Sequence, residues 1–209
     1  MTSSERIEWR SPIASDDYAE YFDQEFLDRL GLANLKVPLT DFWPKSGPRW
    51  DALARTDSNK FLLVEAKAYI EEAVDYRSRA RNRNSRQKIR RALVRTEKAF
   101  HASKDASWVT PFYQYANRLA HLYFLRQLNG IDAYLLFLCF ADARDVPNPC
   151  SVEQWKGAER LIEKCLGLTD HPYRPYVKTI IWRVPEMLAT LTSQESEPYA
   201  SETTQASRL

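Results

Sequence analysis

Residues 49–68 read RWDALARTDSNKFLLVEAKA, and this stretch decides the fold. Its apolar residues alternate or run together on both sides of the polar cluster at 56–60, which predicts two short strands joined by a turn. In the second strand, Glu65 and Lys67 are two positions apart and therefore point to the same face. A hairpin closed by this turn would bring Asp51 of the first strand near Glu65. The stretch thus predicts two carboxylates and an ammonium group at one edge of a sheet.

Two carboxylates beside an ammonium group suit a hard cation. Magnesium takes oxygen ligands, usually one or two carboxylates, and leaves the other positions to water, main-chain carbonyls and substrate phosphate. A neighbouring lysine can polarise the attacking water or offset charge on phosphoryl oxygens. The alternative is a surface hairpin in which Glu65 and Lys67 are solvated or paired across strands.

Asp51, followed by Glu65-Ala66-Lys67 after an apolar strand, resembles the PD-(D/E)XK nuclease superfamily, which includes the restriction endonucleases. Trp50 stands where the family's motif has proline. The resemblance implies an α/β fold, a three-layer α/β/α sandwich around a mixed central sheet. It also implies a Mg²⁺- or Mn²⁺-dependent nuclease, with DNA rather than RNA as the expected substrate. By the resemblance, Asp51, Glu65 and the main-chain carbonyl of Ala66 bind the metal. Lys67 then serves the water or the transition state.

The composition is that of an ordinary globular protein. The chain has 209 residues, of which 44% are hydrophobic and 28% charged, with a net charge of +2. Three cysteines without a close pair predict neither a disulfide framework nor a cysteine zinc site, which favours a cytoplasmic setting. The longest apolar run, 134–141, is too short to span a bilayer, so no membrane contact is expected. We expect an arm at 1–15, one nuclease-like domain at 16–191 and a disordered tail at 192–209.

A helix is predicted from about residue 16 to Gly31. A rotation of about 100° per residue places Glu25 within its apolar face and Glu20 on the opposite side. A carboxylate in an apolar face is costly unless it has a partner. Many members of the resembled superfamily carry a helical glutamate ahead of the aspartate, so Glu25 is a further catalytic candidate. The alternative is an ion pair with Arg29, one turn away.

The segment after the hairpin is strongly basic. Residues 77–95 read RSRARNRNSRQKIRRALVR and contain no acidic residue. Such a density of positive charge is most often neutralised by a phosphate backbone, although a solvated face is the alternative. From Ser85 on, the apolar spacing predicts a helix with a basic outer face. The candidate nucleic-acid contacts are Arg77, Arg79, Arg81, Arg83, Arg86, Lys88, Arg90 and Arg91, with Gln87 or Lys88 as further candidates beside the metal.

The spacing of apolar residues in 107–130 predicts a second long helix. Within it, Gln114, Asn117 and Arg118 are polar residues among aromatic ones, and they are candidates to line a cleft. The alternative is that they are buried and satisfied locally.

The remaining elements alternate between strands and helices. A strand is expected near 35–39, a strand buried on both faces at 133–141, a helix at 151–166 and a final strand at 177–184. This order implies a mixed sheet covered by helices and matches the core of the resembled superfamily.

The sequence therefore predicts a metal-dependent nuclease in which activated water attacks a phosphodiester in line. One alternative is a nucleic-acid-binding module of the same fold without catalysis. Another is an interaction protein whose arginines bind an acidic partner. The sequence leaves open whether the chain forms a homodimer.

Overall fold

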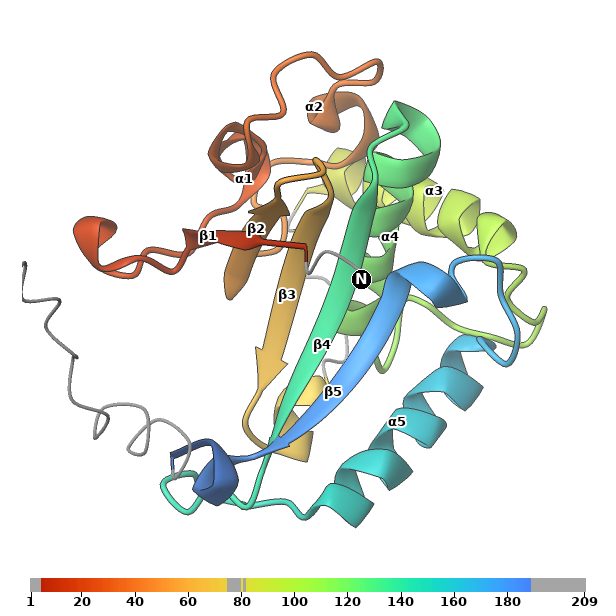
Figure 1. The fold of residues 1–209 in the computed structure, drawn as a ribbon. Helices are drawn as coiled ribbons and strands as arrows, with labels where there is room; N and C mark the ends of the chain where they lie inside the picture. Colours follow the sequence, from red (N-terminus) through yellow and green to blue (C-terminus); the bar gives the residue numbers. More distant parts are fainter. Residues whose placement is uncertain (1–4, 75–79, 81, 189–209) are drawn as a thin grey trace, which may run out of the picture.

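The computed structural model describes residues 5–74, 80 and 82–188. It has an α/β fold around a five-stranded sheet in the order β1-β2-β3-β4-β5 (Figure 1). β1, β2 and β3 are antiparallel neighbours, whereas β3, β4 and β5 run parallel, so the predicted α/β class and mixed sheet are confirmed. The strands are β1 (Ile7–Ser11), β2 (Ala52–Thr56), β3 (Phe61–Lys67), β4 (Ala133–Ala141) and β5 (Val177–Arg183).

The helices fill the connections between strands. They are α1 (Asp23–Leu30), α2 (Leu39–Phe42), α3 (Arg83–Ala99), α4 (Tyr113–Tyr123) and α5 (Val152–Leu166). A π-helical segment, η3 (Phe124–Leu128), continues α4, and short 3-10 turns lie at η1 (Ala14–Asp16), η2 (Ile70–Ala73) and η4 (Arg174–Tyr176).

Several predicted elements are confirmed together with their local causes. The β2–β3 hairpin pairs Ala52 with Val64 and turns through Asn59, whose φ of 62° is a conformation that asparagine tolerates. α3 begins after Asn82, whose side chain accepts the Ser85 amide proton. α5 opens with a capping box at Ser151, as its spacing predicted.

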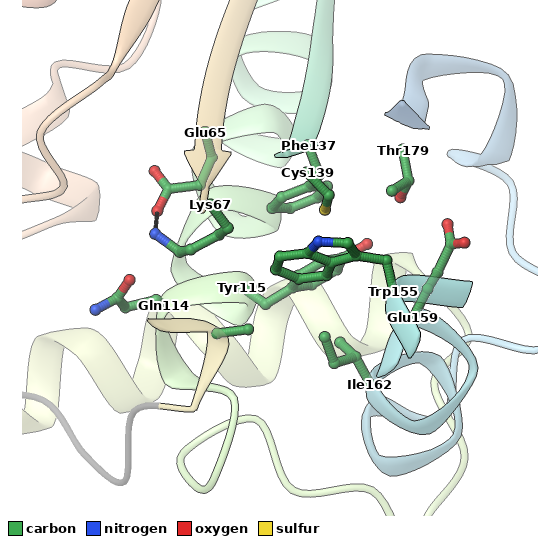
Figure 2. Close-up of a pocket in the computed structure, with 11 residues that line it drawn as sticks. Glu65, Lys67, Gln114, Tyr115, Phe137, Cys139, Trp155, Glu159, Ile162 and Thr179 are labelled. Carbon is green, nitrogen blue, oxygen red and sulfur yellow. Dashed lines mark hydrogen bonds and ion pairs between the residues drawn. The ribbon is translucent and has the colours of Figure 1, made fainter. Parts of the chain in front are cut away.

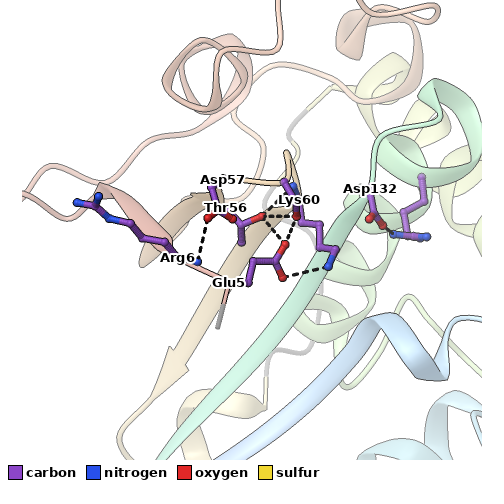
Figure 3. Close-up of polar contacts among 8 residues, drawn as sticks. Glu5, Arg6, Thr56, Asp57, Lys60 and Asp132 are labelled. Atoms are coloured by element: carbon purple, nitrogen blue, oxygen red, sulfur yellow. Dashed lines mark hydrogen bonds and ion pairs between the residues drawn. The ribbon is translucent and has the colours of Figure 1, made fainter. Parts of the chain in front are cut away.

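The expectation of an N-terminal arm is wrong for residues 7–11. They form β1, paired with β2, although the sequence IEWRS gave no strong strand signal. Polar contacts hold the start of this strand against the β2–β3 turn (Figure 3). The Glu5 carboxylate accepts hydrogen bonds from Lys60 Nζ and from the Thr56 hydroxyl, both at 3.0 Å. The expected tail at 192–209 lies outside the described residues.

The first helix is shorter than predicted. It ends at Gly31 as expected but begins only at Asp23, because Asp17 and Tyr18 adopt left-handed φ angles of 56° and 57°. The chain then runs extended, and Tyr21 forms an isolated bridge with Trp50.

Two other expectations change in a similar way. The strand expected near 35–39 is wrong, because Pro38 leads directly into α2. The second long helix starts at Tyr113 rather than at 107 and passes into η3 after Tyr123.

Helices α1 to α5 pack on one face of the sheet, and residues 184–188 form a further helical turn after β5. The strand residues in the buried clusters share that face: Leu53, Phe61, Leu63, Ala133, Leu135, Phe137, Cys139 and Ala141. The alternate residues of β3, β4 and β5 belong to neither cluster, and Figure 1 shows α3 and α4 behind the sheet with no helix in front of these strands. Over the described residues the three-layer sandwich is therefore corrected to two layers. β4 alternates buried and half-buried positions instead of being buried on both faces.

None of the helices in the described part of the chain combines the length and apolar character that crossing a bilayer demands. Cys139 and Cys150 are buried free cysteines, and Cys165 is a half-buried one.

Candidate active site

The hairpin brings the two predicted carboxylates together at the end of β3. Continuing the register by one residue beyond Ala52↔Val64 sets Asp51 opposite Glu65. The Asp51 Oδ2 atom accepts the main-chain N–H of Ala66 at 2.6 Å. The juxtaposition of Asp51, Glu65 and Lys67 predicted from the sequence is therefore present.

Glu65 is a buried carboxylate held by two cations. Its side chain is 4% exposed, and its Oε1 atom accepts a hydrogen bond from Lys67 Nζ at 2.5 Å. On the other side, Arg118 donates from Nε to Oε2 at 2.6 Å and forms an ion pair through a second nitrogen. Burying a carboxylate this deeply is costly unless it has such partners.

Arg118 is itself fixed by further hydrogen bonds. It donates to the Arg49 carbonyl and to the Asn117 Oδ1 atom, each at 2.8 Å. One turn further along α4, His121 is buried among Trp43 and Trp50, and burial lowers its pKa to about 3. This neutral ring and its aromatic neighbours hold α4 against the chain before β2. Both predictions for Arg118 therefore apply. Its hydrogen bonds are satisfied locally, and it also contacts the Glu65 carboxylate in the cleft.

Asp51, Glu65 and Lys67 lie in an open cavity of about 680 Å³. Its walls are the chain around residues 43–49, the ends of β2 and β3, and the first turns of α3 and α4. Its charged lining residues are the basic Lys45, Arg49, Lys67 and Arg118 and the acidic Glu20, Asp51 and Glu65. Gln114 and Asn117 also line it, as predicted. A space of this size, with acids among bases, can admit an extended anion together with a cation.

An apolar wall lies beside the Glu65–Lys67 pair (Figure 2). Tyr115 of α4 stacks on Phe137 of β4 with ring centroids 3.8 Å apart, and Trp155 of α5 lines the same space, a narrow cavity of about 30 Å³. Burial raises the pKa of the Cys139 thiol to about 12 and also raises the pKa of Tyr115, so these two side chains stay neutral near pH 7, while Glu159 lines the far side of the cavity. The low polarity strengthens the ion pair at its edge.

The surroundings of Asp51 disfavour the ionised form of its carboxyl group. Burial raises the pKa of its carboxyl group, and the charge of Glu65 raises it further. Its Oδ1 atom has no hydrogen-bond donor among the described residues. Proton, magnesium and manganese ions would all relieve this charge, so the oxygen donors here fit such a metal. No group of three or more His, Cys, Asp or Glu side chains suited to a metal occurs in the described ranges, so these two carboxylates would need main-chain oxygens and water to complete the set.

Glu25 is not part of this site. It is exposed on α1 and does not line the cavity, whereas Glu20 does. The sequence had assigned them the other way round, because it treated both residues as members of one helix that begins only at Asp23. The alternative for Glu25 is not observed either, since Arg29 pairs with Asp16.

The basic segment 77–95 does not lie on one surface. Arg77, Arg79 and Arg81 lie outside the described residues. Arg83 and Arg86 are exposed in the first turn of α3, beside the cavity-lining Asn82 and Ser85.

The other candidates on α3 face elsewhere. Gln87, Lys88, Arg90 and Arg91 line a separate hollow of about 580 Å³ with Asp41 and Phe42, and Lys88 Nζ donates to the Thr40 carbonyl at 2.6 Å. Gln87 lies two positions from Ser85, about 200° around the helix, which turns it away from the cavity. The expectation that Gln87 or Lys88 assists a metal is therefore wrong.

Sequence reasoning missed the contributions of Lys45, Arg49 and Glu20. The first two lie in the proline-rich chain before β2, where sequence indicated only a bend, and no periodic signal marks their direction.

Comparisons with protein-family models, with curated proteins and with solved structures found no match.

Proposed function

We propose that the chain is a metal-dependent nuclease related to the PD-(D/E)XK superfamily and acting on DNA. The observation that carries the proposal is the hairpin pairing of Asp51 with Glu65, which is buried between Lys67 and Arg118 at an open cavity. Support for the fold part comes from the antiparallel β2–β3 pair followed, after two helices, by the parallel strand β4. The two observed layers differ from the three-layer sandwich expected of that family, so the proposal rests more on the site than on the fold.

The residues of the chain divide the proposed work. Asp51 and Glu65, with the Ala66 carbonyl, would hold Mg²⁺ or Mn²⁺, which supplies Lewis-acid stabilisation of the phosphoryl oxygens. Lys67 orients the attacking water or donates a hydrogen bond to the phosphate, where negative charge builds. Arg118 holds Glu65 in a fixed orientation, and Lys45 and Arg49 attract the phosphate backbone to the cavity.

The test is cleavage of supercoiled, linear double-stranded and single-stranded DNA, with RNA in parallel, in magnesium or manganese. We expect Asp51→Ala and Lys67→Ala to lower the cleavage rate by at least about 100-fold, the scale of losing one group that stabilises a transition state. Lys156→Ala, an exposed lysine on α5 outside the cavity, is the matched control. Cleavage that survives in both site variants, or in excess EDTA, would reject the proposal.

A second candidate is a nucleic-acid-binding module without catalysis. It is favoured by one observation, that both oxygens of Glu65 already accept hydrogen bonds from cations. Calorimetric titration with Mn²⁺ separates the two. A nuclease binds the ion and loses it in Asp51→Asn, whereas a module without catalysis binds DNA with the same affinity in both proteins and shows no ion binding.

A further inference from the structure

The sheet face opposite the helices carries many exposed or half-buried apolar side chains, although Ala54 and Val64 on this face are buried and Lys178 of β5 adds one charge to it. On this face Ile180 and Trp182 of β5 are 47% and 46% exposed, and Ile7 and Trp9 of β1 are 46% and 49% exposed. Between these edges lie the half-buried side chains Leu62, Leu136, Leu138 and Phe140 of β3 and β4. We refer to these eight residues as the open face.

This arrangement is unusual for the strands involved. β3, β4 and β5 run parallel, and parallel strands are almost always covered on both faces. β4 reads AYLLFLCFA, apolar at every position, which is the sequence of a strand with two buried faces. A contiguous apolar surface of this extent marks an interaction site rather than a solvent face.

The open face has the dimensions and border of an interface. Five strands about 4.8 Å apart and about seven residues long span roughly 24 by 23 Å, or about 550 Å² per copy before side-chain relief is counted. Two copies together therefore bury about 1,100 Å², near the lower end of specific protein interfaces. At one end the face is bordered by the polar contacts of Glu5, Thr56 and Lys60 (Figure 3), as an interface core is bordered by a polar rim.

The remainder of the chain is a poor cover for this face. Residues 189–209 read ATLTSQESEPYASETTQASRL, in which Leu191, Tyr199 and Leu209 are the large apolar side chains. Residues 1–4, Met-Thr-Ser-Ser, are short and mostly polar. Neither sequence has the apolar content to bury two tryptophans together with the leucines between them.

A second copy of the chain fits the face better. Trp9 and Trp182 lie on the two outer strands, and β3 is the middle strand of the sheet. Trp9 pairs with Ala54, level with Leu62, whereas Trp182 pairs with Phe140, one residue beyond the Lys67–Cys139 pair, so the two tryptophans are about 20 Å apart along the strands. A twofold axis in the plane between two facing sheets, inclined to β3 by about 45°, therefore places Trp9 of each copy over Trp182 of the other. Each tryptophan is then covered, and two sheets stack at about 10 Å, as in a β-sandwich.

We propose that the protein forms a twofold homodimer through its open face. The proposal is independent of the nuclease assignment, because it rests only on the sheet. Tryptophans near the edge of each sheet and leucines at its centre supply the apolar area of the contact.

The experiment is sedimentation velocity of the full chain over a concentration series, comparing wild type with Trp182→Glu and Trp9→Glu. We expect a concentration-dependent dimer that each substitution weakens by at least about tenfold in Kd. Leu161→Glu is the matched control, since Leu161 is 57% exposed on α5, on the helix side. This control should leave the dimer unchanged. Circular dichroism of each variant checks that it is folded, and the second tryptophan serves if one variant fails to fold.

Two results would overturn the inference. One is a monomer at every concentration, whether another protein or the chain's own terminal residues then cover the open face. The other is a dimer that both tryptophan variants retain, because it would use a different surface.

Discussion

The carboxyl group of Asp51 lies in surroundings that favour its neutral form, since burial and the neighbouring Glu65 both raise its pKa above 3.8. A carboxyl whose pKa is higher in the folded state stabilises folding below its ordinary pKa. That contribution is lost as the pH rises through the raised value. At neutral pH, the charge that a metal would need is therefore a cost to stability.

Asp51→Asn should for this reason be more stable than wild type at neutral pH in EDTA. The amide oxygen can still accept the Ala66 N–H, while the charge facing Glu65 is gone. We expect a gain of up to about 1 kcal/mol, the usual scale for relieving strain at a functional site. The gain should shrink as the pH falls towards 4. Thermal unfolding across pH measures it, with the exposed Asp145→Asn as control. A variant less stable than wild type at pH 7 would show that the cations around Asp51 outweigh its burial.

Arg118 should be worth more to stability than an ordinary surface arginine. Its side chain and that of Glu65 are 8% and 4% exposed, so removing the guanidinium leaves a buried charge with a single partner. We expect Arg118→Met to cost about 3 kcal/mol in urea unfolding. Arg183→Met, which breaks an exposed pair with Asp142, should cost at most about 1 kcal/mol. In a double-mutant cycle, Glu65→Gln should recover part of the Arg118→Met loss. Equal losses for the two arginines would contradict this role.

Glu20 and Glu25 provide a direct test of the corrected site. Glu20 lines the cavity and Glu25 does not, although both are exposed and five residues apart in the sequence. We expect Glu20→Gln to lower cleavage or Mn²⁺ affinity by about threefold to tenfold, because it removes negative charge near the carboxylates. Glu25→Gln should leave both unchanged. The reverse result would restore the assignment made from the sequence.

At the scale of elements, the hairpin is where sequence reasoning succeeds. A turn cluster between two apolar runs fixes the pairing of β2 with β3, and this pairing determines which residue faces Glu65. The prediction of which residues lie on which face of a helix is less reliable, because an error in the starting residue shifts the predicted face of every residue that follows. The left-handed Asp17 and Tyr18, which end the first turn before α1, follow from tertiary contacts such as the Tyr21–Trp50 bridge.

α3 permits a test of where nucleic acid binds. Arg83 follows the cavity-lining Asn82, whereas Arg91 lines the separate hollow with Asp41. We expect Arg83→Glu to weaken DNA binding severalfold and to reduce the slope of log K against log salt by about 1 to 2. Arg91→Glu should have a smaller effect. A glutamate in the first turn also favours the helix dipole, so Arg83→Glu should not unfold α3. Fluorescence anisotropy in EDTA measures both, and equal losses would indicate binding along the whole helix.

At the scale of the whole molecule, the layers were the feature that sequence predicted least well. The apolar run of β4 correctly indicated a strand with two faces to bury, but a sequence does not say whether the cover comes from the same chain. The helices α1, α3, α4 and α5 all pack against Leu53, Leu63, Phe137 or Cys139 and their neighbours on one side. The strand β1 then widens the uncovered side.

The sheet separates the candidate active site from the open face. This separation predicts that dimerisation and cleavage can be lost independently of each other. Along β3, Glu65 points to the helix side while Leu62 points to the open face, so one layer of backbone divides the two surfaces. We expect Trp182→Glu to become monomeric yet to keep its cleavage rate per chain, and Lys67→Ala to lose cleavage yet to sediment as a dimer. Sedimentation and cleavage on the same samples measure both. A folded, monomeric Trp182→Glu that no longer cleaves would contradict this independence and indicate that the second copy supports the site.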